Sequence, residues 1–302
     1  MKNVLCTEFW RNRPFFVVII VFFFAAWVAM PLFRSNIMKK ELILLAVVSV
    51  SLTGCLQPTA RSMGATLMPS PLTHRANPDS ASQEISLAAS GFYGHTGDAY
   101  NVENLNAGGG NVGVTYRLGG KLSPLFANVA VGAFGGSLRF GCDKNSNCDK
   151  NSSFDQKYAD WLESDEGSKS YSFWNVQERI LAGADFNIGY AIFGAAGGVQ
   201  LFQSGSDYDD VREKLDDEGL VNSKDEKNGV GAVSSVWLGS YLGRHGQYGN
   251  LVAEMDIFYK GDIDDWTSSI KWTYTHPSGF FGGAAYGNLM ELTLFAGKQF
   301  VF

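Results

Sequence analysis

Apolar and polar residues alternate through most of the chain after position 84, and this pattern limits the fold more than any other feature. The last residues show it clearly, because one face carries Leu292, Leu294, Ala296, Phe300 and Phe302. A period of two belongs to the β-strand. In a soluble sheet the apolar face points to a core, whereas in a transmembrane barrel it faces lipid and the polar face lines the lumen.

The pattern recurs often enough to predict an all-β fold, a closed antiparallel transmembrane barrel of about ten strands, with eight or twelve as alternatives. Each clear strand has about the length needed to cross a bilayer at a tilt. The 35 glycines against eight prolines also suit a β-rich chain. The predicted strands are 85–93, 112–118, 125–133, 175–190, 193–201, 230–242, 251–259, 270–274, 280–287 and 291–302.

The connections between these strands differ in length in a regular way. Long polar segments, 94–110, 135–170 and 203–229, follow the first, third and fifth strands, while GGKLS, YAI, GRHGQYG and HPSG read as tight turns. Outer-membrane barrels have short periplasmic turns and long external loops. The run NAGGGNVG at 106–113 precedes a strand and does not open a helix, so we predict a turn there and no nucleotide-binding loop.

Charged residues occupy the face opposite the apolar one, so in a membrane barrel they would point into the lumen. A narrow lumen would force such charges to pair or to keep water. A soluble β-sandwich would not bury so many charges at alternate positions. The predicted lumen charges are Arg117, Arg179, Asp185, Glu254, Asp256, Lys271 and Glu291.

The N-terminal region holds two apolar runs of different kinds. Residues 14–33 are long enough for a membrane-spanning helix, whereas 38–54 has a methionine, two lysines and a short apolar core, as a secretory signal does. We interpret 38–54 as the signal and 1–37 as an extension outside the fold, with a transmembrane helix as the alternative. Residues 55–83 are rich in Pro, Ser, Thr and Ala without periodicity, which predicts a flexible tether.

The motif Leu52-Thr53-Gly54-Cys55 resembles a bacterial lipobox. The resemblance implies cleavage after Gly54 and lipidation of Cys55, with palmitate among the acyl chains. A residue other than Asp at Leu56 implies sorting to the outer membrane. The alternative is a buried free cysteine after a short core segment.

From about Glu84 to Phe302 the chain resembles a small bacterial outer-membrane β-barrel protein. Phe300 and Phe302 resemble the C-terminal signal read by the outer-membrane assembly machinery, and Lys298 departs from that pattern. The resemblance implies a lipid-anchored place in the bacterial outer membrane, with membrane lipid and the assembly machinery as partners. With the N-terminal lipid and Phe302 both expected on the periplasmic side, the strand number would be even.

The second long loop carries Cys142 and Cys148, which in an exported protein predict a disulfide. Four oxygen ligands alternate around them, as in calcium loops, but the glycine and the bidentate glutamate of such loops are missing. A solvated polar loop is therefore the preferred interpretation over a calcium site at Asp143, Asn145, Asn147 and Asp149. The third long loop predicts a short helix, 209–220, with a solvated outer face, the alternative being cation or partner binding.

Signatures of catalysis are few in this sequence. The four histidines lack metal-ligand spacing, and the net charge of −6 argues against a nucleic-acid partner. We predict no cofactor and a non-catalytic structural role, with limited solute passage or adhesion through the loops. One alternative is a soluble, lipid-anchored lipocalin-like barrel or sandwich that binds an apolar or carbohydrate ligand. Another is a barrel enzyme acting on lipid through His95 and Asp98 at the rim.

Overall fold

The computed structural model describes residues 59–61, 67, 70, 72–75, 77, 80–96, 103–140, 161, 164–207, 209–218, 222–224, 227–260, 265–287, 290 and 292–302. The predicted signal 38–54, the run 14–33, Cys55 and the loop with Cys142 and Cys148 lie outside these ranges, as does Glu291. Within the described ranges, no helix is both long and apolar enough to cross a membrane.

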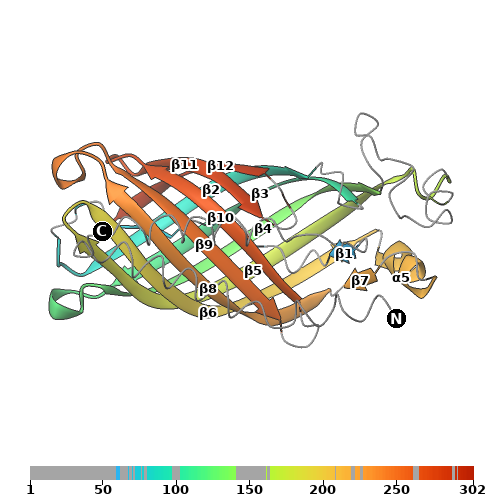
Figure 1. Ribbon diagram of the computed structural model, residues 1–302, viewed down its shortest axis with the longest axis horizontal. Coiled ribbons are helices and arrows are strands. Elements are labelled where there is room, and N and C mark those ends of the chain that lie inside the picture. Colours follow the sequence, from blue (N-terminus) through green and yellow to red (C-terminus); the bar gives the residue numbers. More distant parts are fainter. Residues whose placement is uncertain are drawn as a thin grey trace, which may run out of the picture. The chain divides into compact units, whose positions relative to one another are not determined.

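Ten antiparallel strands close into a barrel, which confirms the predicted fold (Figure 1). Closure is made by the first and last barrel strands, since Leu294 of β12 lies opposite Tyr93 of β2. The barrel strands are β2 Glu84–Thr96, β3 Glu103–Arg117, β4 Leu125–Phe140, β5 Ser170–Ile188, β6 Ala191–Ser206, β8 Asn228–Tyr241, β9 Asn250–Lys260, β10 Asp265–Thr275, β11 Phe280–Gly287 and β12 Leu292–Val301.

The two ends of the barrel differ, as the connection lengths predict. At the turn end, the strands are joined by four short connections: 118–124, 189–190, 242–249 and 276–279. Phe302 also lies at this end, where its backbone N donates to Ile85 O at 2.9 Å. At the loop end, the connection 207–227 contains helix α5 Asp209–Asp217 and the short strand β7 Asn222–Lys224. Strand β1 Thr59–Arg61 pairs with β7 in parallel.

The glycine-rich run 106–113 is not a turn, so that prediction is wrong. It lies inside β3, where Gly109 is opposite Phe134 and Gly108 is opposite Tyr93. A Cβ at Gly109 would lie 2.3 Å from Ala133 O, so this part of the wall requires glycine. Glycines carry no apolar or polar signal, which explains why the alternation is lost where the strand continues.

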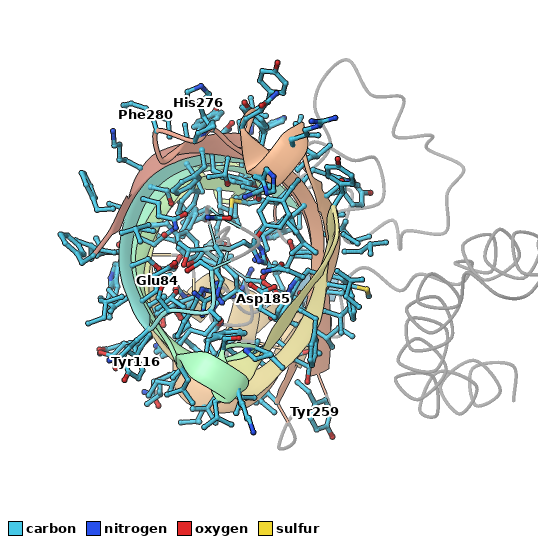
Figure 2. All side chains as sticks on the ribbon, turned by 90° about the vertical axis from the view of Figure 1, so that its left-hand side faces the viewer. Glu84, Tyr116, Asp185, Tyr259, His276 and Phe280 are labelled. Carbon is cyan, nitrogen blue, oxygen red and sulfur yellow. The ribbon has the colours of Figure 1, made fainter. Side chains whose placement is uncertain are left out.

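The apolar strand faces point outward from this barrel. Exposed large apolar side chains cover the outer wall of every barrel strand: examples are Ile85, Val112, Val129, Ile180, Val199, Val230, Leu251, Trp272, Tyr286 and Leu294. Figure 2 shows Tyr116 and Tyr259 pointing away from the lumen and Glu84 and Asp185 pointing into it. The alternative of a lipocalin-like barrel with these faces turned inward is therefore wrong.

Candidate functional site

Buried side chains pack into the lumen, and its loop end is apolar. Leu105, Leu138 and Tyr171 are buried in one cluster with aromatic rings from several strands. The Phe134 ring lies 6.1 Å from the rings of both Phe92 and Phe173, measured between centroids. Tilted and edge-to-face contacts between aromatic rings stabilise the fold beyond the free energy gained by burying the rings.

Helix α5 packs against this apolar cluster. Its Val211 and Leu215 are buried in it, and Leu215 is fully inaccessible to water. The predicted helix is therefore present, but its inner face is part of the core and is not simply a solvated loop surface. At its outer side Lys214 Nζ lies 2.8 Å from Glu166 Oε2, and this hydrogen bond lowers the pKa of the Glu166 carboxyl.

Charged residues fill the lumen between the middle of the strands and the turn end. The structure buries the six predicted lumen charges that it describes: Arg117, Arg179, Asp185, Glu254, Asp256 and Lys271. Unpaired charges in such surroundings would be very costly, so their partners decide whether the lumen is stable.

One group of four charges is centred on Asp256. The Lys271 ammonium lies 2.7 Å from Asp256 Oδ2 and 3.0 Å from Glu254 Oε1, while Arg179 Nη1 lies 3.1 Å from Asp256 Oδ2. Ser235 donates a further hydrogen bond to Asp256 Oδ1 at 2.5 Å. Two cations and two carboxylates make this cluster neutral, which removes most of the penalty of burying them together.

A second group is centred on Asp185, nearer the turn end. Arg117 Nη1 lies 3.1 Å from Asp185 Oδ2, and the Trp237 indole donates to Asp185 Oδ1 at 3.0 Å. His74 Nδ1 lies 3.2 Å from the same carboxylate. Glu84 Oε1 lies 3.6 Å from Arg117 Nε. Glu84 is not among the lumen charges predicted from the sequence, although it lies two residues before the inward-facing Ser86 and therefore on the same face of the strand.

His74 belongs to a part of the chain that precedes the barrel strands and lies inside the lumen. We call Leu67, Ser70 and Leu72–Arg75 the threaded segment, and all of these residues are buried. The cluster around Asp256 holds its backbone: Arg179 donates to Ser70 O at 2.6 Å, and Lys271 donates to the same oxygen at 3.2 Å. Leu72 N in turn donates to Glu254 Oε2 at 3.3 Å.

The rest of the threaded segment is bonded nearer the turn end. Thr73 Oγ1 lies 2.9 Å from the hydroxyls of both Ser86 and Thr115, and Arg117 donates to Thr73 O. Tyr241 donates to Arg75 O at 2.9 Å, and the Arg75 guanidinium donates to carbonyls of the β3–β4 turn. Side chains of the barrel therefore satisfy backbone groups that have no secondary structure of their own.

The threaded segment runs lengthwise through the lumen. Ser70 contacts Arg179 near the middle of β5, whereas Arg75 reaches Leu118 and Ser123 at the turn end. Strand β1 pairs with β7 in the loop-end connection. An extended chain spans at most about 3.3–3.6 Å per residue, so the residues between Arg61 and Arg75 can cover roughly 45 Å.

The predicted tether 55–83 is therefore not a free linker over its second half. Among its described residues, Ser70 and 72–75 belong to no helix or strand, so no periodicity marks them in the sequence. Its hydrogen bonds are supplied by the barrel wall, and sequence patterns do not report contacts of that kind.

The remaining predicted site residues lie apart from this cluster. Phe300 and Phe302 are exposed on the outer wall at the turn end. His95 Nδ1 lies 2.9 Å from Asn106 Oδ1 at the loop end of β2, and Asp98 lies outside the described residues. Cys55 and the residues of the candidate disulfide and calcium loop also lie outside them, and the described part of the chain has no cluster of three metal-ligating side chains.

No family model matches this chain, and no curated protein matches its sequence. It is similar to an outer-membrane channel from Pseudomonas putida F1, with 9% identity, a TM-score of 0.37 and coverage of 78% of this chain and 100% of that one. It is also similar to Ail of Yersinia pestis, crystallised with a heparin analogue, with 12% identity, a TM-score of 0.27 and coverage of 72% and 99%. The translocator domain of autotransporter NalP from Neisseria meningitidis gives 10% identity, a TM-score of 0.32 and coverage of 74% and 88%.

Proposed function

We propose that this protein is a non-catalytic barrel of the bacterial outer membrane whose lumen is closed by its own threaded segment. In this account the segment carries the chain that precedes the barrel to the outer side of the membrane. The observation that carries the proposal is the passage of the chain from β1 at the loop end to Arg75 at the turn end.

The barrel surface supports a place in the membrane. An outer wall of exposed Val, Ile, Leu and aromatic residues, around a lumen with paired charges, is the arrangement of outer-membrane barrels and the reverse of a soluble protein. Ordinary soluble monomers do not expose apolar surface all the way round. The exposed Phe300 and Phe302 at the end of β12 fit a signal for the assembly machinery.

The orientation follows from the loops. Short turns of outer-membrane barrels face the periplasm, so the loop end with β1 would face outward. We further propose that Cys55 is lipidated. Only three residues separate Cys55 from Thr59, so a lipid on Cys55 would be anchored on the outer side. This differs from the periplasmic anchor expected from the sequence.

The filled lumen favours a structural and surface-display role over an open channel. Small solutes would pass only when the threaded segment leaves its sites on Arg179, Lys271 and Tyr241. Adhesion through the loops, with a disulfide between Cys142 and Cys148, is compatible with this account. The calcium site in that loop stays a weaker proposal, because the glycine and glutamate of calcium loops are missing.

Cysteine labelling on intact cells tests the proposed topology. Single cysteines are introduced in a chain whose Cys142 and Cys148 are serine, and the cells are treated with a membrane-impermeant maleimide. We expect Thr59→Cys to be labelled. Glu213→Cys, at an exposed position on α5, is the control and should be labelled as well. Lys121→Cys, in the turn-end connection, should be labelled only after the outer membrane is permeabilised.

Three results would overturn this function. Labelling of Lys121→Cys but not Glu213→Cys on intact cells would show that the barrel has the opposite orientation. Protection of Thr59→Cys while Glu213→Cys is labelled would show that the chain does not emerge on the outer side. Recovery of the folded protein in water without detergent would contradict membrane insertion itself.

A further inference from the structure

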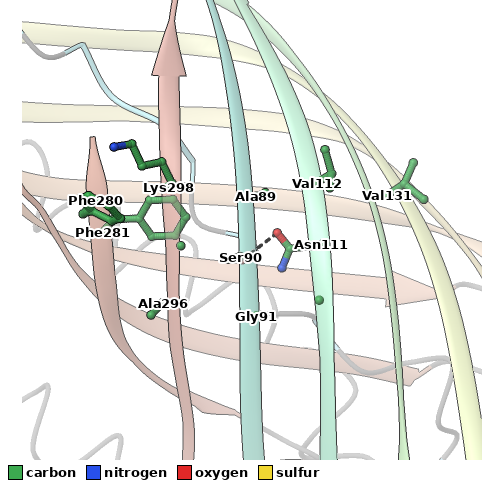
Figure 3. A pocket seen from close by; sticks show the side chains of 12 residues that line it. Ala89, Ser90, Gly91, Asn111, Val112, Val131, Phe280, Phe281, Ala296 and Lys298 are labelled. Atoms are coloured by element: carbon green, nitrogen blue, oxygen red, sulfur yellow. Dashed lines mark hydrogen bonds between the residues drawn. The ribbon is translucent and has the colours of Figure 1, made fainter. Parts of the chain in front are cut away.

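A groove on the outer wall of the barrel has no role in the account so far. Its volume is about 690 Å³, and it crosses β11, β12, β2, β3 and β4 (Figure 3). Its floor consists of outward-facing strand positions that carry very small side chains or none: Ala89, Gly91, Gly110 and Ala296. Val112 and Val131 border it toward the middle of the membrane wall.

At Gly91 the small residue of the floor is not a by-product of close backbone packing, whereas a Cβ at Gly110 would lie 3.1 Å from Ser90 O. A Cβ built at Gly91 meets nothing nearer than Gly109 O at 3.7 Å, which is an ordinary contact distance. Elsewhere in the same wall, glycines such as Gly109 leave no space for a side chain. Gly91 therefore leaves room that a larger side chain would fill.

A cationic side chain lies at the turn-end side of the groove. Lys298 Nζ is 3.9 Å from the centroid of the Phe280 ring and 5.7 Å from that of Phe300. Figure 3 shows the Lys298 side chain beside Phe280. Among the residues that the structure describes, no carboxylate forms an ion pair with Lys298, whereas the lumen lysine Lys271 has two.

The position of Lys298 along the barrel suggests its role. Phe280 begins β11 directly after the turn 276–279, and Lys298 lies opposite it. This is the level of the membrane interface, where a lysine costs far less than at the midplane and can reach lipid phosphates. From there the groove leads past Ala89 toward Val131, deeper in the hydrocarbon region.

We propose that this groove binds one glycerophospholipid of the periplasmic leaflet. Its phosphate pairs with Lys298, and one acyl chain lies along the floor over Gly91 and Gly110. The apolar lining suits the acyl chain. The Lys298 ammonium, which has no carboxylate partner among the described residues and lies beside aromatic rings, suits the anionic headgroup. The assignment to the periplasmic leaflet rests on the proposed function, because it takes the turn end to face the periplasm.

Native mass spectrometry of the barrel in a mild detergent tests this site. The barrel is released from vesicles of phosphatidylglycerol and phosphatidylethanolamine, and the lipid that it retains is counted. The native barrel should keep about one phospholipid. Lys298→Glu should reduce occupancy by roughly fivefold or more, the size of one interfacial charge contact, and Gly91→Leu should reduce it by filling the floor. Lys121→Glu, at an exposed turn lysine, is the matched control and should retain the lipid.

Folding is checked on the same samples by heat-modifiable mobility on a gel, which separates the possible failures. Equal lipid retention by folded native, Lys298→Glu and Gly91→Leu barrels would overturn the lipid site and leave the proposed function intact. A chain that is soluble without detergent would overturn both. If Lys298→Glu fails to fold, the Gly91→Leu variant decides the question alone.

Discussion

Removal of the Lys271 charge is the sharpest test of the lumen network. Lys271 is fully buried, and its ammonium contacts Asp256 Oδ2, Glu254 Oε1 and Ser70 O. Methionine has a similar length and no charge, so Lys271→Met leaves one excess negative charge among the four residues of the cluster. Breaking a buried ion pair by removing one partner costs about 3–5 kcal/mol, and we expect a loss of stability in that range.

A second variant isolates the charge as the cause. Lys271→Met combined with Glu254→Gln restores neutrality, because Asp256 keeps Arg179 and Ser235 as partners. Replacing both members of a buried pair is often close to neutral. The double variant should therefore recover at least about 2 kcal/mol of the loss.

Urea unfolding in detergent micelles, followed by tryptophan fluorescence and gel mobility, measures both values. The exposed Lys121→Met is the control and should change stability by less than about 0.5 kcal/mol. The reasoning would be refuted if Lys271→Met lowered the free energy of unfolding by no more than this control does. It would also be refuted if adding Glu254→Gln lowered the free energy of unfolding further, by as much as the loss of a second buried partner.

Three further predictions concern the lumen, the wall and the loop end. Deletion of 62–75 should give ion conductance in planar bilayers where the native barrel gives none, and an unchanged current would show that the lumen is closed by other groups. Gly198→Val should prevent barrel folding, since a Cβ there would lie 1.8 Å from Ile180 O; a heat-modifiable species from this variant would contradict it. Glu166→Gln should speed amide exchange near the loop end at neutral pH. Because the hydrogen bond from Lys214 lowers the Glu166 pKa, the stabilisation from this pair is lost as pH falls through that lowered pKa. The native protein and Glu166→Gln should then exchange at the same rate. Amide exchange measured across the pH range checks this.

The sequence predicts the barrel well because alternation records which side of the wall each residue faces. Arg179 and Asp185 alternate with outward apolar residues, and both are buried in the lumen. The ends of strands are less well predicted. β3 starts at Glu103, well before the predicted 112, because Gly108 to Gly110 carry no polarity signal.

The threaded segment escapes prediction for a different reason. Thr73 and His74 form their hydrogen bonds with Thr115 and Asp185, far along the chain. Such contacts leave no local period, and a segment rich in Pro, Ser and Thr resembles a linker. The spacing of Val211 and Leu215 indicates that α5 has one apolar face. The sequence does not say which surface of the barrel this face packs against, and that surface decides whether the two residues are buried.

An engineered disulfide between the threaded segment and the barrel wall tests the central claim most directly. The hydroxyls of Thr73 and Thr115 lie 2.9 Å apart, so the paired cysteines of Thr73→Cys and Thr115→Cys are close enough to bond. Ser235→Cys, which faces Asp256 in the other cluster, replaces Thr115→Cys in the control pair. In a chain whose Cys142 and Cys148 are serine, we expect the first pair to form a disulfide that blocks maleimide labelling of the denatured protein until reduction, and the control pair to stay reduced and to be labelled on denaturation. Free thiols in both pairs of a folded barrel would contradict a chain threaded through its own lumen.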